Sequence, residues 1–154
     1  MLNLNNEKML STGLLCIRLI LGFVFFYHGA QKLFGIFCGH GIQGTAGFFE
    51  SKGIPFPVLS VYLAGGAQFL GGIALMLGFA VRPIGLILTF TMLVAAYTHM
   101  PNGFSNQKGG FEFPFTLAMI SLSLFFTGGG KFSLASFIKC KKCETGVNAA
   151  NQQA

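Results

Sequence analysis

Four long apolar segments alternate with polar or glycine-rich stretches along the chain, at residues 10–30, 58–81, 83–98 and 113–130. The second and fourth contain no Asp, Glu, Lys, Arg or His. At a rise of about 1.5 Å per residue, a helix over either one would cross the hydrocarbon core of a bilayer, which is about 30 Å thick. The third is shorter, so we expect its helix to extend past His99 or to lie where the bilayer is thinned. The pattern predicts an all-α integral membrane four-helix bundle.

The stretch between the first two apolar segments, residues 34–57, is rich in glycine. Thr45 is a residue type that caps the start of a helix, and Gly53 is a type that ends one. These signals predict a short helix that carries Phe48 and Phe49 at the membrane interface. We expect this helix to lie across one mouth of the bundle as a lid.

Small residues recur at helical spacing in the second apolar segment, at Ala67, Gly71, Ala74 and Gly78. A stripe of small side chains lets a neighbouring helix approach closely in a membrane. We therefore expect a tight helix–helix contact on this face.

The two halves of the chain resemble each other weakly. His28 ends the first apolar segment as His99 ends the third, and Glu50 and Glu112 precede the second and fourth. If the halves are parallel repeats, these four residues meet at the same mouth of the bundle. The alternative is that the flanking aromatic residues and prolines are ordinary boundaries of membrane spans.

Composition supports a membrane protein of one domain. Hydrophobic residues make up 53% of the 154 residues and charged residues 9%, which is too apolar for a small soluble core. The net charge of +6 fits a membrane surface, because no basic patch interleaved with polar readers lies outside the spans. We expect the lipid bilayer as a partner and no nucleic acid. The first apolar segment is too long for a cleaved signal, so we expect it to remain as a span.

Basic residues divide unevenly between the two sides of a four-span protein. Six lie on the side of both termini: Lys8, Arg82, Lys131, Lys139, Lys141 and Lys142. Three lie on the other side: Lys32, Lys52 and Lys108. The positive-inside rule therefore predicts cytoplasmic N- and C-termini.

Arg18 lies well inside the first apolar segment, where a charge is costly. One interpretation is that its long side chain reaches the headgroups. The other is a fixed cation that orients a polar ligand or pairs with a buried acceptor such as Gln68. The sequence leaves both open.

His28 and Lys32 lie one helical turn apart at the other end of this segment. Two cationic groups so close invite an acidic partner, and topology makes Glu112 the nearest candidate. Together with His99, these residues predict a group that exchanges protons with a quinone or another redox ligand. The alternative is an interfacial hydrogen-bond network without a ligand.

Metal binding and cysteine chemistry are weaker candidates. The histidines and glutamates lack a tight ligand spacing such as H-x-x-x-H, so we expect no metal site. Cys140 and Cys143 form C-K-K-C, whose lysines would favour the thiolate, but one such motif in a cytoplasmic tail indicates an incidental pair. Cys16 and Cys38 lie at opposite ends of a span, which excludes a disulfide between them.

Four motifs give the chain a family resemblance over about residues 18–134. They are R-L-I-L-G-F-V-F-F-Y-H-G-A-Q-K-L-F-G, A-G-G-A-Q-F-L-G-G-I-A-L-M-L-G-F-A-V-R-P, F-E-F-P and G-G-G-K-F-S-L-A-S, in this order. In this order and spacing the chain resembles a DoxX family membrane protein. The resemblance implies a DoxX-like four-span domain over residues 1–135, followed by a basic, disordered cytoplasmic tail over residues 136–154.

The resemblance makes Arg18, His28, Lys32 and Glu112 the positions that match the family's polar pattern. The family usually carries an acidic residue where Gln68 stands and an Asp where Ala135 stands, so a proton relay through those two positions is in doubt. Relatives include the small membrane subunit of a thiosulfate and quinone oxidoreductase and membrane partners of redox-defence complexes.

We therefore expect a multi-pass protein of the bacterial inner membrane that serves as a subunit of a redox system. His28 and Glu112 are the candidate catalytic, proton-handling groups, and Arg18, Lys32, Gln68 and His99 the candidate ligand-binding residues. Quinone is the candidate cofactor, a soluble redox enzyme at the cytoplasmic face the candidate partner, and an oligomer is allowed. The alternatives are a non-catalytic scaffold that recruits a soluble enzyme through the tail, and a small-solute carrier.

Overall fold

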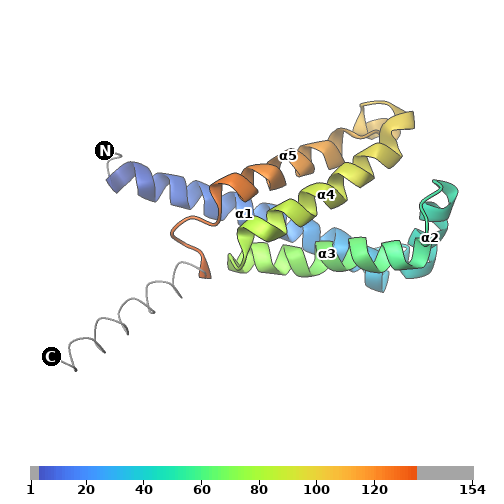
Figure 1. Cartoon of the computed structure of the whole chain (residues 1–154), viewed down its shortest axis with the longest axis horizontal. Coiled ribbons are helices and arrows are strands. Elements are labelled where there is room, and N and C mark those ends of the chain that lie inside the picture. Colours follow the sequence, from blue (N-terminus) through green and yellow to red (C-terminus); the bar gives the residue numbers. More distant parts are fainter. Residues whose placement is uncertain (1–3, 135–154) are drawn as a thin grey trace, which may run out of the picture.

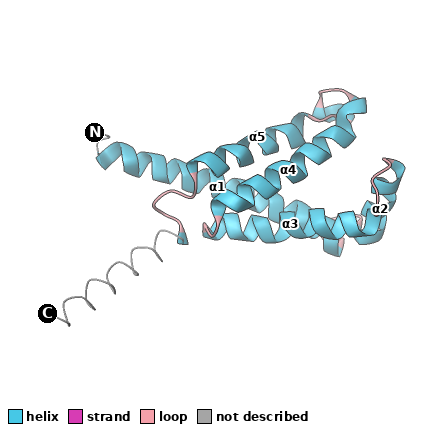
Figure 2. Ribbon diagram, in the orientation of Figure 1, coloured by secondary structure: helices cyan, strands magenta, loops and turns pink. Residues whose placement is uncertain are grey.

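The computed structural model describes residues 4–134, and every regular element in that part of the chain is a helix (Figure 2). The elements in order are α1 (Leu4–Phe34), α2 (Gly41–Ser51), α3 (Pro57–Leu77), α4 (Val81–His99), the 3₁₀ turns η1 (Met100–Asn102) and η2 (Asn106–Lys108), and α5 (Glu112–Thr127).

The four long helices form two pairs, since α1 packs mainly on α3 and α4 mainly on α5 (Figure 1). The pairs come together near the α3–α4 turn and diverge from there. We call the end with the α3–α4 turn the closed end. We call the other end, where α2, η1 and η2 lie, the open end.

Three helices are long and apolar enough to cross a membrane, over Asn6–Phe34, Pro57–Leu77 and Val81–Asn102. The fourth, α5, is apolar but shorter, at 16 residues. Large apolar side chains such as Ile20, Leu70 and Phe126 point outward and are exposed. Outward apolar side chains on all sides suit a bundle surrounded by lipid. The prediction of an all-α membrane bundle is confirmed.

One expectation about the boundaries is confirmed and one is wrong. The third span extends past His99, because η1 continues α4 to Asn102. The prediction that Thr45 caps the short lid helix is wrong. That helix, α2, begins at Gly41 after His40, and Thr45 is buried inside it. Gly41 has a φ of +64°, a conformation that glycine adopts without strain, so the chain turns into the helix there.

Glycines allow α1 and α3 to touch backbone to backbone. A Cβ atom added to Gly72 would lie 2.5 Å from the backbone nitrogen of Phe26 and 2.6 Å from the carbonyl oxygen of Gly22. A Cβ added to Gly29 would lie 2.7 Å from the Cα of Phe69. No side chain larger than hydrogen fits at these positions, which explains why this pair packs so closely.

The predicted small-residue stripe is a contact surface, but it serves two different neighbours. Gly71 faces α4, where an added Cβ would lie 3.3 Å from the methyl carbons of Leu88. Gly78 ends α3 with a φ of +73° and lies against the guanidinium of Arg18. The stripe therefore positions α4 and the closed end, while other glycines make the contact with α1.

Arg18 joins the two helix pairs at the closed end. Its side chain is 0% exposed, and its Nε donates to the carbonyl oxygen of Leu75 in α3 at 3.1 Å. Its terminal nitrogens donate to the carbonyl oxygens of Gly129 and Phe132, in the segment that follows α5. Leu75 lies in the last turn of α3, where carbonyl oxygens carry partial negative charge, and carbonyl oxygens outside helices have no helical donor. They therefore provide the polar surroundings that a buried guanidinium needs.

Candidate functional site

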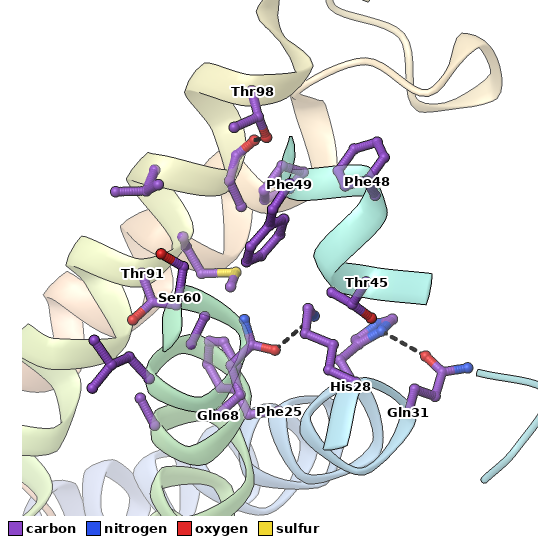
Figure 3. A pocket seen from close by; sticks show the side chains of 18 of the residues that line it. Phe25, His28, Gln31, Thr45, Phe48, Phe49, Ser60, Gln68, Thr91 and Thr98 are labelled. Atoms are coloured by element: carbon purple, nitrogen blue, oxygen red, sulfur yellow. Dashed lines mark hydrogen bonds between the residues drawn. The ribbon is translucent and has the colours of Figure 1, made fainter. Parts of the chain in front are cut away.

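A cavity of about 1190 Å³ occupies the space between the two helix pairs toward the open end (Figure 3). Residues of α1, α2, α3, α4 and α5 all line it. Exposed residues of two neighbouring helices, Leu63 of α3 with Ile87 and Phe90 of α4, are among them. The cavity therefore opens sideways between α3 and α4, toward the surrounding lipid.

Besides Thr91, Thr98 and His99 on α4, five polar lining residues gather on one side of the cavity, where α1, α2 and α3 meet. We call this set the polar corner; it consists of His28, Gln31, Lys32, Thr45 and Gln68. The opposite wall, on α4, is mainly apolar and includes Leu86, Ile87, Phe90, Met92, Val94 and Ala95. A cavity with one polar corner and an apolar wall fits an amphipathic molecule.

Lys32 and Gln68 are the central pair of the polar corner. The Nζ of Lys32 donates to the Oε1 of Gln68 at 2.8 Å, and Gln68 is 1% exposed. The two residues come from α1 and α3, which the glycine contacts hold at a short distance. The close packing of this helix pair therefore fixes the position of the ammonium group.

His28 has a defined tautomer through its neighbour Gln31. The Nε2 of Gln31 donates to the carbonyl oxygen of Phe37 at 3.0 Å, which orients the side-chain oxygen toward the ring. That oxygen lies 3.1 Å from the Nδ1 of His28. With the hydrogen assigned to Nδ1 by this network, the neutral ring keeps Nε2 as an acceptor. His28 can thus accept a proton from a bound molecule.

Aromatic side chains bridge the two helix pairs at the open end. Phe48 of α2 stacks on the ring of His99 in α4, with centroids 5.9 Å apart. The ring of His28 meets Phe113 of α5 edge to face at 5.7 Å. Phe49 points from α2 into the cavity (Figure 3). The short helix α2 therefore covers part of the mouth, as the sequence predicts for a lid.

The structure brings four of the six predicted site residues to one cavity: His28, Lys32, Gln68 and His99. It does not bring the other two there. Arg18 lies at the closed end on backbone carbonyls, and Gln68, its suggested acceptor, pairs with Lys32 instead. Glu112 is exposed and its carboxylate accepts a hydrogen bond from the backbone N–H of Asn106 at 3.1 Å. This hydrogen bond holds the carboxylate of Glu112 in the loop before α5. The polar partner of His28 is Gln31 instead.

Gln31, Cys38 and Thr45 are among the lining residues that the sequence does not single out as site residues. Gln31 follows His28 by three residues, a spacing that places both on one helix face, so it could have been found. Thr45 is a residue type that often caps the start of a helix, so its type alone does not indicate a cavity. Cys38 has no pattern around it that points to a cavity.

Cysteines and metal ligands give no further cluster in the part of the chain that the structure describes. Cys16 and Cys38 are both free and exposed. Within residues 4–134, no three His, Cys, Asp or Glu side chains come close enough together to hold a metal ion. Cys140 and Cys143 lie outside the described residues.

Comparison with known proteins gives one family and one relative. The DoxX family model matches residues 13–101. The chain is 30% identical, over 143 residues, to a Bacillus subtilis (strain 168) protein named "Putative oxidoreductase CatD". The match covers 93% of this chain and 99% of that protein. No solved structure matches the chain.

Proposed function

The chain belongs to the DoxX family of membrane proteins, and from this premise we propose that it is the membrane subunit of a redox system. In this proposal the cavity receives a lipophilic redox carrier, such as a quinone, from the bilayer. The name of the B. subtilis relative, which describes an oxidoreductase, supports the redox part.

The polar corner opposite an apolar wall is the observation that carries the proposal. A quinone has oxygen acceptors on a ring and an apolar tail. Its ring oxygens would accept hydrogen bonds from Lys32, while the tail would lie along the apolar residues of α4. The sideways opening between α3 and α4 gives such a molecule a route from the lipid.

His28 is the group we propose to exchange protons with the carrier, because its Nε2 is free to accept one. Reduction of a quinone consumes protons and oxidation releases them, so a histidine at the ring can serve both directions. Glu112 is exposed at the same end of the bundle and would exchange protons with water. Arg18 has a structural role in this proposal, at the closed end.

We further propose that the protein resides in the bacterial inner membrane with both termini in the cytoplasm. The uneven distribution of basic residues supports this orientation, which puts the open end of the cavity at the outer face. A soluble redox enzyme would bind at the cytoplasmic face, on which this orientation would put the basic residues of the sequence after residue 134.

Quinone binding to the purified protein in nanodiscs tests the proposal. We expect a short-chain quinone to bind saturably. With dithionite added as the electron donor and water as the proton source, we expect His28→Ala to slow the two-electron, two-proton reduction of the bound quinone while leaving expression intact. Arg82→Gln, which changes an exposed residue far from the cavity, is the control. Absence of binding at saturating quinone would exclude this function.

A further inference from the structure

No carboxylate lines the cavity to balance its lysine. Its lining residues include one lysine and three histidines, His28, His40 and His99, and no carboxylate. Within residues 4–134 the one ion pair joins Lys131 to Glu7, at the closed end. The ammonium of Lys32 therefore stands inside the protein with a neutral amide as its polar partner.

The Lys32–Gln68 pair has more hydrogen-bond donors than acceptors left for a ligand. An ammonium group has three N–H donors and no acceptor, and the oxygen of Gln68 engages one of them. Because lysine only donates, the oxygen of Gln68 must face it, and the NH₂ group of Gln68 is turned away. The pair therefore offers the cavity a cluster of donors from a charged and a neutral group.

From these two observations we propose that the cavity selects a ligand whose polar end carries a negative charge. Lys32 is the specificity-determining residue, and Gln68 is a positioning residue that holds the ammonium in place. The ligand class is an amphiphile with one anionic oxygen, such as an acidic hydroxyquinone or a fatty acid. This inference rests on the proposed function in taking the cavity to be a ligand site, and it adds the charge of the ligand.

The apolar part of the site limits the kind of anion. A small inorganic anion would leave the wall formed by α4 without contact, and the large apolar area would then face water. The sideways opening between α3 and α4 admits molecules from the lipid phase. Both features favour an anion attached to a hydrocarbon tail.

The test compares two quinones that differ in charge but hardly in shape. A 2-hydroxy-3-alkyl-1,4-naphthoquinone is already ionised at about pH 7, and its 2-methoxy counterpart is neutral. With the full chain in nanodiscs of zwitterionic phosphatidylcholine, we expect the acidic quinone to bind tighter, on the order of tenfold to a hundredfold, as hydrogen bonds to a charged group do. Equal affinities for the two quinones would overturn the inference and leave the proposed function standing.

Variants of Lys32 assign the preference to this residue. We expect Lys32→Met, which has a similar length and no charge, to bind the two quinones with similar affinity, because the acidic compound loses a charged partner while the methoxy compound loses one neutral hydrogen bond. Lys32→Arg keeps the charge and should keep the preference. Thermal unfolding checks that each variant is folded, and Lys32→Gln replaces Lys32→Met if that variant is not. A preference that survives in the folded, uncharged variant would overturn the inference.

Palmitate, as a third probe, separates this inference from the proposed function. If palmitate competes as well as the acidic quinone while the methoxy quinone does not bind, the charge selection stands and the quinone assignment fails. If the acidic quinone alone binds tightly and palmitate does not compete, both stand. If none of the three binds, both fail.

Discussion

The Nε–H of Arg18 in α1 donates to the carbonyl oxygen of Leu75 in the last turn of α3, at 3.1 Å. The same guanidinium also donates to the carbonyl oxygens of Gly129 and Phe132, in the segment that follows α5 in the sequence. Because arginine keeps its charge in any protein environment, this one side chain links both helix pairs wherever the closed end lies in the membrane.

Replacement of Arg18 by Met should destabilise the bundle. The variant removes the donor from the half-buried carbonyl oxygens of Gly129 and Phe132 and one of two donors from that of Leu75, which keeps the N–H of Gly78. Loss of its partner costs a buried group about 1–3 kcal/mol, so we expect a clear loss of stability. Arg82→Met, at an exposed arginine, is the matched control and should unfold close to the wild type. Thermal unfolding in detergent measures both, and equal midpoints for the two variants would contradict a structural role for Arg18.

Gly72→Ala should separate α1 from α3. The new methyl group would lie within 2.6 Å of backbone atoms of α1, and backbone cannot move aside cheaply. Gly66→Ala, in the same helix, meets nothing within 4 Å and should be neutral or slightly stabilising, because alanine favours a helix over glycine. The measurement is the difference in unfolding midpoint, and a Gly66→Ala variant that is less stable than Gly72→Ala would refute the packing argument.

Gln68→Glu should remove the cavity's preference for anions. The new carboxylate would lie at hydrogen-bond distance from the ammonium of Lys32 and neutralise it, as charge-assisted pairs do. We expect the variant to bind the acidic and methoxy quinones with similar affinity and to remain folded. Gln68→Leu is the companion variant, which leaves the ammonium unneutralised. A Gln68→Glu protein that still prefers the acidic quinone would show that Lys32 does not set the selection.

A ligand in the cavity should protect Cys38 from alkylation. Cys38 lines the cavity, whereas Cys16 is exposed on the outward side of α1. Treatment with N-ethylmaleimide, followed by mass spectrometry of each cysteine, should show slower modification of Cys38 when quinone is bound. Cys16 serves as the internal control and should react at the same rate in both samples. Unchanged modification of Cys38 at saturating quinone would place the ligand elsewhere.

Labelling of introduced cysteines tests the orientation in the membrane. In a cysteine-free background, Ser105→Cys lies in the loop at the open end and Lys8→Cys near the closed end, both exposed. Cytoplasmic termini predict that an impermeant maleimide labels Ser105→Cys on intact cells and labels Lys8→Cys after lysis. The opposite pattern would reverse the proposed orientation.

The spans and the lid could be predicted because hydropathy, prolines and glycines are local signals. Part of the polar corner could be predicted. His28, Lys32 and Gln68 are unusual residue types in apolar segments, so the sequence identifies each of them singly, but not their pairing. The pairing of Lys32 with Gln68 depends on the rotation of α3 about its own axis. Glycines occur on several faces of α3, at Gly65, Gly66, Gly71 and Gly72, and so the sequence does not reveal which face meets α1.

The closed end could not be predicted at all. The partners of Arg18 are backbone carbonyl oxygens, and every residue has one, so no side-chain pattern marks Leu75, Gly129 or Phe132. The position of Glu112 has a similar cause. Topology suggested that it would meet His28, but a hydrogen bond from the N–H of Asn106, six residues away, is local and holds the carboxylate in the loop.

The contrast between the two ends determines how much the width of the cavity can vary. Hydrogen bonds from a fully buried cation fix the closed end, whereas ring contacts such as Phe48 with His99 bridge the open end. For helices of about 20 residues, or about 30 Å, a rotation of about 5° at the fixed end moves the far end by about 2.6 Å. A small angular change, with no hydrogen bond broken, thus alters the entrance by more than the radius of a methyl group, so tails of different thickness can be accommodated while the headgroup contacts on α1 and α3 stay unchanged.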